Sequence, residues 1–316
     1  MVGPDPTDTA DPTDLDRPTD PADLDHPTDP TGPTSPVGST GPTHLTDPTA
    51  PPFATLSGLT SAGLAELAPR IKEAWQRHPV LVFHGCALTP EDLVTFGALF
   101  GTPVPVPPQE GIVDTTGLPP EIMIVSNIVE NGRPLGHLGG GDLNWHTDMC
   151  YVPEPALASA LYAVEVPDGH GDTWFLDMAA VYDRLPERLR TRIATLTCKH
   201  DDSRTAAGDL RHGREPVVDI TTSSGAVHPL VKVRPESGRP ALYLGRRLNA
   251  HIPGLPLAES EALLDELWAY CDDPALARPH RWRAGDLVVW DNRVMMHRRD
   301  AIPDGARRLM RRIQAR

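Results

Sequence analysis

The chain has 316 residues with 29 basic and 43 acidic side chains, and its formal net charge of −14 disfavours nucleic-acid binding unless a local basic patch overrides it. No run of about 18 uncharged apolar residues occurs, and no basic stretch followed by an apolar core opens the sequence, so we expect neither a membrane span nor a secretory signal. The four cysteines form no CxxC pair, which is typical of a reducing compartment and predicts a cytoplasmic protein.

Residues 1–52 differ in composition from the rest of the chain. They hold ten Asp, no Glu, Arg17 as the single base and 13 of the 36 prolines. The stretch at residues 14–21 recurs with one change at residues 23–30. Such a segment can bury almost no apolar surface, so we interpret it as a disordered acidic tail, with a docking array as the alternative. Residues 53–316 are expected to form one compact domain.

The first elements of this domain are expected to be two helices around a strand. Residues 64–75 have apolar side chains at helical spacing, and Pro69 is expected to start or kink this helix. Residues 79–83 form a short apolar run that is typical of a buried strand. Thr89 and Pro90, followed by two acids, predict the start of a second helix.

Most of the remaining chain is typical of short strands separated by turn residues. The expected strands are residues 122–125, 144–150, 159–166, 173–176, 287–290, 294–298 and 308–313. A hairpin is expected from residues 227–233 and 241–244, and helices from residues 187–196 and 257–271. This order favours a mainly β fold, a barrel or double sheet with flanking helices. A parallel βαβ sheet fits poorly, because neither GxGxxG nor a P-loop is present.

The tripeptide His-x-Asp occurs three times, at His146, His170 and His200. On a strand it places both side chains on one face, and a distant His can then complete a two-His-one-carboxylate metal site with open positions. His170 lies in a Gly-rich turn, and His200 is expected to enter a polar loop. Only His146 and Asp148 lie in a strand-like setting, although a single His-x-Asp is more often an ordinary surface or turn histidine.

Three segments together carry a family resemblance. They are Trp145-His146-Thr147-Asp148, then Gly171-Asp172-Thr173, then the run from Gly285 to Arg293 (GDLVVWDNR) followed by His297. In this order they resemble the taurine dioxygenase/2,4-dichlorophenoxyacetate dioxygenase family of Fe(II)- and 2-oxoglutarate-dependent oxygenases. The resemblance implies a jelly-roll (double-stranded β-helix, cupin-like) core over residues 80–316. The extended, Gly-rich strand with which family members usually begin has no clear equivalent here.

The resemblance also implies the site residues. His146, Asp148 and His297 take the positions of the iron ligands, and Thr173 and Arg308 those that hold the far carboxylate of 2-oxoglutarate. Arg312 takes the position of a residue that meets an anionic group on the substrate. In a strand Arg308 and Arg312 point the same way, about 13 Å apart at the Cα atoms, and can serve two different anions. If the histidines were absent, the alternative for the arginine-rich run at residues 307–312 would be a solvated basic end of the chain.

The expected activity is oxidation of an unactivated C–H bond of a small molecule bearing a carboxylate or sulfonate, with 2-oxoglutarate and O₂ converted to succinate and CO₂. Hydroxylation, desaturation and cleavage stay open, whereas Asp148 disfavours halogenation. Asn144 is a candidate substrate contact, with a turn or strand-edge role equally open. The alternatives are a non-catalytic jelly-roll metal-binding protein and an interaction protein that acts through its tail. No nucleic-acid or membrane partner is expected, and a homo-oligomer is left open.

Overall fold

A computed structural model describes residues 53–106 and 117–316. The chain divides into two units, residues 1–42 and residues 43–316, and all described residues belong to the second. The predicted acidic tail, residues 1–52, lies outside the described residues. No helix in the described ranges combines the length and the apolar character that a bilayer span needs.

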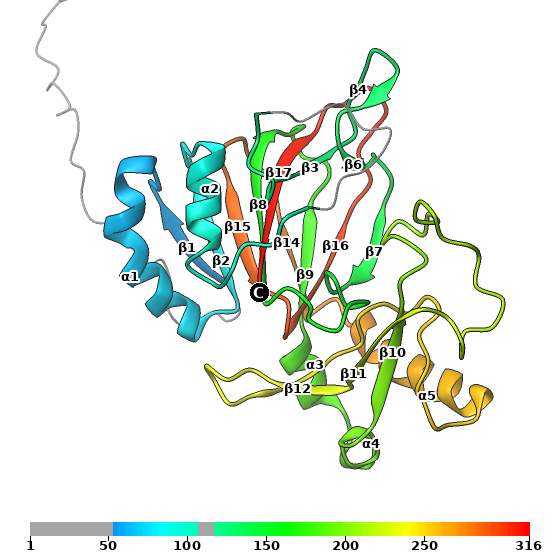
Figure 1. Ribbon diagram of the computed structural model, residues 1–316. Coiled ribbons are helices and arrows are strands. Elements are labelled where there is room, and N and C mark those ends of the chain that lie inside the picture. The colour runs from blue at the N-terminus through cyan, green and yellow to red at the C-terminus, as the bar shows by residue number, and fades with distance from the viewer. Residues whose placement is uncertain (1–52, 107–116) are drawn as a thin grey trace, which may run out of the picture. The chain divides into compact units, whose positions relative to one another are not determined.

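Two sheets form the centre of the described unit (Figure 1). In spatial order the larger sheet contains β1 (Phe53–Ser57), β2 (Val80–His84), β15 (Leu287–Asp291), β8 (Ala158–Glu165), β17 (Leu309–Ala315), β3 (Met123–Ser126) and β6 (His137–Leu138). The smaller sheet contains β14 (Ala277–His280), β9 (Thr173–Asp177), β16 (Met295–Arg299) and β7 (Leu143–His146). The mainly antiparallel pairing of strands distant in sequence is that of a jelly roll, as the family resemblance implies.

Short strand pairs and helices complete the described unit. The pairs are β4 (Val129–Glu130) with β5 (Arg133–Pro134), β10 (Thr197–Asp201) with β11 (Gly225–Pro229), and β12 (Val231–Val233) with β13 (Pro240–Leu242). The helices are α1 (Ser61–Arg77), α2 (Pro90–Gly97), α3 (Met178–Arg184), α4 (Glu187–Ile193) and α5 (Leu257–Ala269), which a 3₁₀ turn (Tyr270–Asp272) follows. In Figure 1, α1 and α2 lie beside β1, β2 and β15.

The central strands of the larger sheet are buried on both faces. In β15, Leu287 and Val289 belong to one apolar cluster, which includes residues of α1 and α2, whereas Val288 and Trp290 belong to a second cluster, which includes residues of β9 and β16. Side chains of a strand alternate between faces, so a continuous apolar run indicates a strand covered on both sides. The second cluster lies on the face that also carries the candidate metal ligands.

Both expected N-terminal helices are confirmed, with one correction. Thr89 and Asp92 form a capping box at the start of α2, and Pro90 is the first helical residue. Pro69, however, lies inside α1 and does not start it. Helix α1 continues through this proline because it is anchored on both sides by buried residues, among them Leu64 and Trp75.

Three other expectations about the strands need correction. The strand expected over residues 144–150 ends at His146, and Asp148 lies in the turn that follows, where Met149 has a φ of 54°. The expected hairpin is formed by β12 and β13, but residues 227–229 pair with β10 instead. His200, expected in a polar loop, is a buried residue of β10. An N-terminal strand, β1, is also present, parallel to β2.

Candidate metal centre

Two neighbouring strands of the smaller sheet bring the candidate metal ligands together. His146 is the last residue of β7 and stands directly opposite His297 of β16, so the two imidazoles share one face. The turn after β7 brings the Asp148 carboxylate next to both imidazoles. The Nε2 atoms of His146 and His297 lie 3.8 and 4.0 Å from the two carboxylate oxygens of Asp148. Among the described residues, this trio is the one group of His, Cys, Asp and Glu side chains close enough to share an ion.

The surroundings of the two imidazoles favour the neutral form, which binds metals. The Nδ1–H of His146 donates to the carbonyl of Asn144 at 2.7 Å, so its Nε2 lone pair faces Asp148 and His297. Burial lowers the pKa of His146, against the opposing charge of Asp148. Burial and the neighbouring His146 lower the pKa of His297 well below its ordinary value.

The carboxylate of Asp148 is held in its charged form. Burial alone would raise its pKa, but the charges of Arg312, His297 and His146 and a hydrogen bond from Ser159 bring the pKa well below its ordinary value. The Ser159 hydroxyl donates to Oδ2 at 2.8 Å, and Arg312 donates from Nη1 to Oδ1 at 3.1 Å. Asp148 is therefore an anion at neutral pH, as a ligand to a divalent cation must be.

A chain of hydrogen bonds connects Asp148 to the WDNR part of the C-terminal motif. Trp290 donates through Nε1 to the side-chain oxygen of Asn292, and the Asn292 amide donates to the Ser159 hydroxyl. The distances are 2.9 and 2.8 Å. Ser159, on β8, then holds Asp148. Trp290 and Asn292 of the motif thus help to position Asp148, the candidate ligand, through Ser159.

A second polar cluster surrounds Thr173, the first residue of β9. Trp282 donates its Nε1–H to the Thr173 hydroxyl at 3.0 Å, which leaves the hydroxyl proton of Thr173 free to donate elsewhere. The Arg308 guanidinium lies with its Cζ atom 5.9 Å from the centre of the Trp282 ring. The Asn127 side chain accepts from the Arg308 backbone N–H and donates to the carbonyl of Ala306. The Asn127 side chain therefore fixes the backbone that carries Arg308.

Arg308 is a deeply buried cation with free donors. Its side chain is among the largest fully buried ones, and burial, with the nearby charge of Arg299, lowers its pKa to about 9. Nε and Nη2, one edge of the guanidinium, have no hydrogen-bond partner among the described residues. A buried charge is costly unless it is paired, and this edge has the geometry that grips a carboxylate with two parallel hydrogen bonds. The cluster therefore has the donors that a buried carboxylate would need.

The structure places the other two candidate residues differently. Arg312 lies on the inner face of β17 and, besides pairing with Asp148, lines a cavity of about 890 Å³. The side chain of Asn144 is exposed and is not among the residues that line this cavity. Its backbone carbonyl, rather than its side chain, serves the metal centre. A substrate contact by Asn144 stays a prediction.

The cavity opens directly onto the metal centre and is rich in arginine. His146, Asp148 and Arg312 line it, together with Arg211 and Arg246. The guanidinium groups of Arg211 and Arg246 lie 4.1 and 5.7 Å from the centre of the Tyr151 ring, which also lines the cavity. Residues of the segment 202–214 also line the cavity. The cavity offers cationic groups and an aromatic surface to a small molecule.

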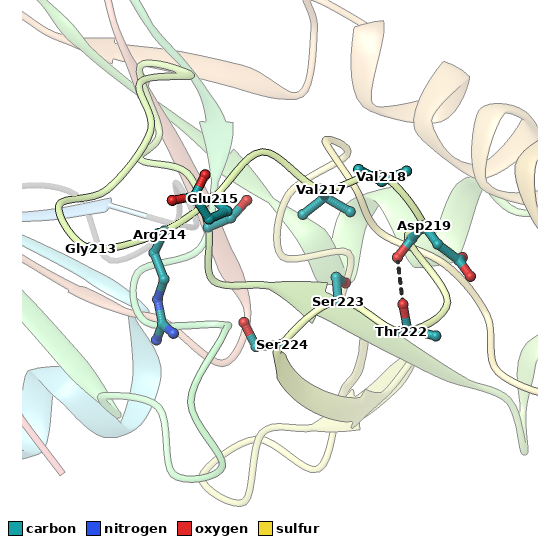
Figure 2. Close-up of a pocket in the computed structure, with 10 residues that line it drawn as sticks. Gly213, Arg214, Glu215, Val217, Val218, Asp219, Thr222, Ser223 and Ser224 are labelled. Carbon is teal, nitrogen blue, oxygen red and sulfur yellow. Dashed lines mark hydrogen bonds between the residues drawn. The ribbon is translucent and has the colours of Figure 1, made fainter.

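A second hollow, of about 360 Å³, lies among residues 203–224 (Figure 2). Its polar groups are satisfied locally: Thr222 donates to the carbonyl of Asp219 at 3.2 Å, and Arg214 pairs with Asp202. None of the described residues that line it has a buried polar atom without a partner. The hollow therefore lacks the unpaired buried donors that distinguish the first site.

Ser159, Asn292 and Trp282 were not identified from the sequence. Trp282 and Asn292 bond to residues 109 and 133 positions away, and Ser159 bonds to Asp148 from another strand, so no local spacing marks them. The available signal is the polar ending Asp291-Asn292 after an apolar strand, because polar side chains that are buried there need hydrogen-bond partners.

Comparisons with known proteins agree with this geometry. A family model described as "Taurine catabolism dioxygenase TauD, TfdA family" matches residues 46–314. The (S)-phenoxypropionate/alpha-ketoglutarate-dioxygenase of Delftia acidovorans is 34% identical over 259 residues, which cover 77% of this chain and 82% of that protein. Pentalenolactone F synthase of Streptomyces arenae is 34% identical over 269 residues, covering 77% of this chain and 85% of that protein.

Solved structures show the same likeness. The structure of AAD-2 in complex with Mn(II) and N-oxalylglycine has a TM-score of 0.67 and 28% identity, covering 86% of this chain and 96% of that one. A taurine dioxygenase from Burkholderia xenovorans has a TM-score of 0.65 and 28% identity, covering 86% of this chain and 89% of that one. These likenesses agree with the jelly-roll architecture described above.

Proposed function

Because the chain belongs to the TauD/TfdA family of alpha-ketoglutarate-dependent dioxygenases, we propose that it uses Fe(II), 2-oxoglutarate and O₂ to oxidise a C–H bond of a small anionic molecule. The observation that carries this proposal is the juxtaposition of two donor sets. The trio of His146, Asp148 and His297 offers three ligands on one side of an ion, and the buried edge of Arg308 offers unpaired donors to an anion. Two imidazoles and one carboxylate are the ligands typical of non-haem Fe(II) oxygenases.

In this proposal the protein binds and orients the iron and 2-oxoglutarate and shields them from solvent. His146, Asp148 and His297 hold the iron, while Arg308 and the Thr173 hydroxyl hold the far carboxylate of 2-oxoglutarate. When bound, the iron would activate O₂, which is the oxidant: 2-oxoglutarate would give up two electrons and leave as succinate and CO₂, and the substrate C–H bond would give up the other two. The retained carboxylate ligand, Asp148, favours oxygenation over halogenation.

The proposed substrate carries a carboxylate, sulfonate or similar anion. Arg312 pairs with Asp148, and Arg211 and Arg246 also line the cavity, as do the acids Glu121, Asp202 and Asp209. Tyr151 adds an aromatic ring close to Arg211 and Arg246. Relatives named for phenoxypropionate and taurine act on an aryloxy carboxylate and a sulfonate, which fit such a lining. We also propose a cytoplasmic location, since the four cysteines are free and buried.

A succinate-release screen tests the proposal. The purified chain is incubated with Fe(II), ascorbate, 2-oxoglutarate and O₂ across small aryloxy carboxylates and sulfonates. We expect substrate-dependent succinate from the wild type and from His170→Ala, a matched control at an exposed His-x-Asp. We expect none from His146→Ala. A wild type that binds Fe(II) through His146 but never 2-oxoglutarate would instead be a non-catalytic metal-binding protein. Product analysis distinguishes hydroxylation, desaturation and cleavage.

A further inference from the structure

A second buried arginine lies beside the proposed co-substrate site. Arg299 is two residues beyond His297 on β16, so both side chains leave the same face of the strand. Its cross-strand partner on β9 is Thr173. Directly opposite residues of an antiparallel pair have Cβ atoms about 5 Å apart. The fold therefore places Arg299 beside the hydroxyl proposed to hold the far carboxylate.

The Arg299 guanidinium is oriented by the protein and still has free donors. The side chain is 3% exposed. Nη2 donates to the carbonyl oxygens of Leu138 and Gly141, which fixes the plane of the group. Nε and Nη1 are buried without a hydrogen-bond partner among the described residues. These two donors need an acceptor, because unsatisfied buried polar groups are rare in native proteins.

The two buried guanidinium groups act on each other. The positive charge of Arg299 contributes to the lowered pKa of Arg308. Burial lowers the pKa of Arg299 to about 10, and the charge of Asp142, an exposed acid, opposes this shift. Two unpaired cations in a buried space are strongly unfavourable unless an anion joins them. A carboxylate between the two groups and Thr173 can accept from Nε and Nη2 of Arg308, which share one edge, and from one of the two free donors of Arg299.

On this basis we propose that Arg299 is a second arginine that binds the far carboxylate of 2-oxoglutarate, together with Arg308 and Thr173. The inference rests on the proposed function and adds a residue to it. Because the same guanidinium holds the carbonyls of residues 138 and 141, it also connects the co-substrate site to the glycine-rich loop before β7. Gly140 of that loop accepts from the backbone of Ile302, so the loop is held to the segment after β16 at a further point.

The rival interpretation gives Arg299 a purely structural role as a clamp for this loop. A pair of co-substrates separates the two roles. 2-Oxoglutarate and 2-oxopentanoate have the same carbon chain and the same keto acid end, but 2-oxopentanoate lacks the far carboxylate. A residue that binds this carboxylate affects the affinity for 2-oxoglutarate alone, whereas a loop clamp affects the affinities for both compounds alike.

The experiment is calorimetric titration of the Mn(II)-loaded full chain with each compound. For Arg299→Met we expect the affinity for 2-oxoglutarate to fall about tenfold or more, as for a lost hydrogen-bonded ion pair, and the affinity for 2-oxopentanoate to change less than about twofold. Arg299→Lys keeps the charge and is expected to lose less. The matched control is Arg298→Met, whose guanidinium pairs with Asp300 on the other face of the strand. Mn(II) affinity, measured separately, is expected to stay unchanged in all three variants.

The outcomes distinguish this inference from the proposed function. Equal losses for both compounds, or no loss for either, in Arg299→Met would overturn the inference. If that variant does not fold, the same ratio measured in Arg299→Lys decides: an equal loss for both compounds rejects it, and a loss confined to 2-oxoglutarate supports it. Arg308→Met is titrated in parallel. If it too binds 2-oxoglutarate normally, or the wild type does not bind it at all, the proposed function itself is wrong.

Discussion

The orientation of the Ser159 hydroxyl is determined by the groups around it. A hydroxyl can donate one hydrogen bond and accept two. The amides of Asn292 and Gln314 donate to Ser159 at 2.8 and 3.0 Å and occupy both acceptor positions. The single hydroxyl proton therefore points to Asp148, 2.8 Å away. Ser159 is a positioning residue that holds the carboxylate in the place where a metal would meet it.

We predict that Ser159→Ala weakens metal binding about 10- to 100-fold, the usual effect of removing a partner that orients a metal ligand. Fe(II) or Mn(II) titration measures this affinity. Ser260→Ala is the matched control, because Ser260 is a buried serine of α5 that accepts from the backbone of Ile252. Both variants are expected to lose some stability. An unchanged metal affinity in Ser159→Ala would show that Asp148 is held without it.

The candidate ligands could be predicted from the sequence, whereas the residues that hold them could not. His146 and Asp148 lie two residues apart in one short motif, and the GDLVVWDNR run shortly before His297 marks that histidine. Ser159 and Arg299 have no such signal. Ser159 reaches Asp148, 11 residues away, from another strand, and Arg299 lies opposite Thr173 only through the register of β16 and β9. In the sequence alone, the run His297-Arg298-Arg299 is typical of a solvated surface.

At the scale of elements, Asp286 holds three segments together. It is the residue before β15, and its carboxylate is 2.8 Å from Nδ1 of His84 on β2 and 3.1 Å from Nε2 of His280 on β14. It also accepts from the backbone N–H of Arg283. Burial opposes the charged form of Asp286, yet these hydrogen bonds lower its pKa overall. One side chain thus fastens an edge strand of the smaller sheet to the larger sheet.

We predict that Asp286→Asn lowers the free energy of unfolding by about 2–3 kcal/mol at pH 7, the cost of losing hydrogen bonds to a buried charge. A pKa lower in the folded than in the unfolded state stabilises the protein above the unfolded value of about 3.9, and this contribution disappears as the pH falls through the folded value. The difference from wild type should therefore shrink below about pH 4.

Urea unfolding of both proteins from pH 7 to about pH 3.5 measures this difference. The control is Asp304→Asn, at an exposed carboxylate, which should change the free energy of unfolding by less than about 0.5 kcal/mol. A deficit in Asp286→Asn that stays constant across the whole pH range would mean that the carboxylate charge contributes nothing.

The elements that the sequence predicted well are those with one dominant local signal. The LVVW run of β15 and the capping box of α2 are examples, because a continuous apolar run and capping chemistry are both visible within a few residues. The early end of β7 at His146 could not be predicted in this way. It depends on the turn in which Met149 takes a positive φ, and on the hydrogen bond from the Thr147 N–H to the carbonyl of Gly245. Tertiary contacts there override the strand pattern.

At the scale of the whole molecule, the buried apolar residues of the described ranges begin at Ala54. The family match begins at residue 46, and the unit that contains the described residues begins at residue 43. We predict that a variant lacking residues 1–42 keeps its midpoint of thermal unfolding within about 2 °C and its succinate production within about twofold. The removed residues are acidic, but a charge beyond a Debye length of about 8 Å is screened.

Thermal unfolding and succinate release of the truncated and full chains measure this directly. A drop of more than about 5 °C, which corresponds to more than about 1 kcal/mol for a domain of this size, would place the segment in the folded core. Unchanged stability with lost turnover would instead assign the acidic segment a role at the active site.

Ligand binding should stabilise the whole fold in two separate steps. A ligand present at about 100 times its Kd adds about 2.7 kcal/mol to the free energy of unfolding, which raises the midpoint by roughly 5–10 °C for a chain of this size. We predict one such rise with Mn(II) and a second when 2-oxoglutarate is added. The second step is expected because the unpaired buried donors of Arg308 gain an acceptor when the anion binds.

Two variants separate these steps by the same measurement. His297→Ala is expected to lose both rises, since the metal is lost and the keto acid end of 2-oxoglutarate then has nothing to bind. Arg308→Gln is expected to keep the rise with Mn(II) and to lose most of the second. If 2-oxoglutarate raised the midpoint of His297→Ala as much as that of the wild type, its binding would not depend on the metal centre. The buried arginines alone would then hold the anion.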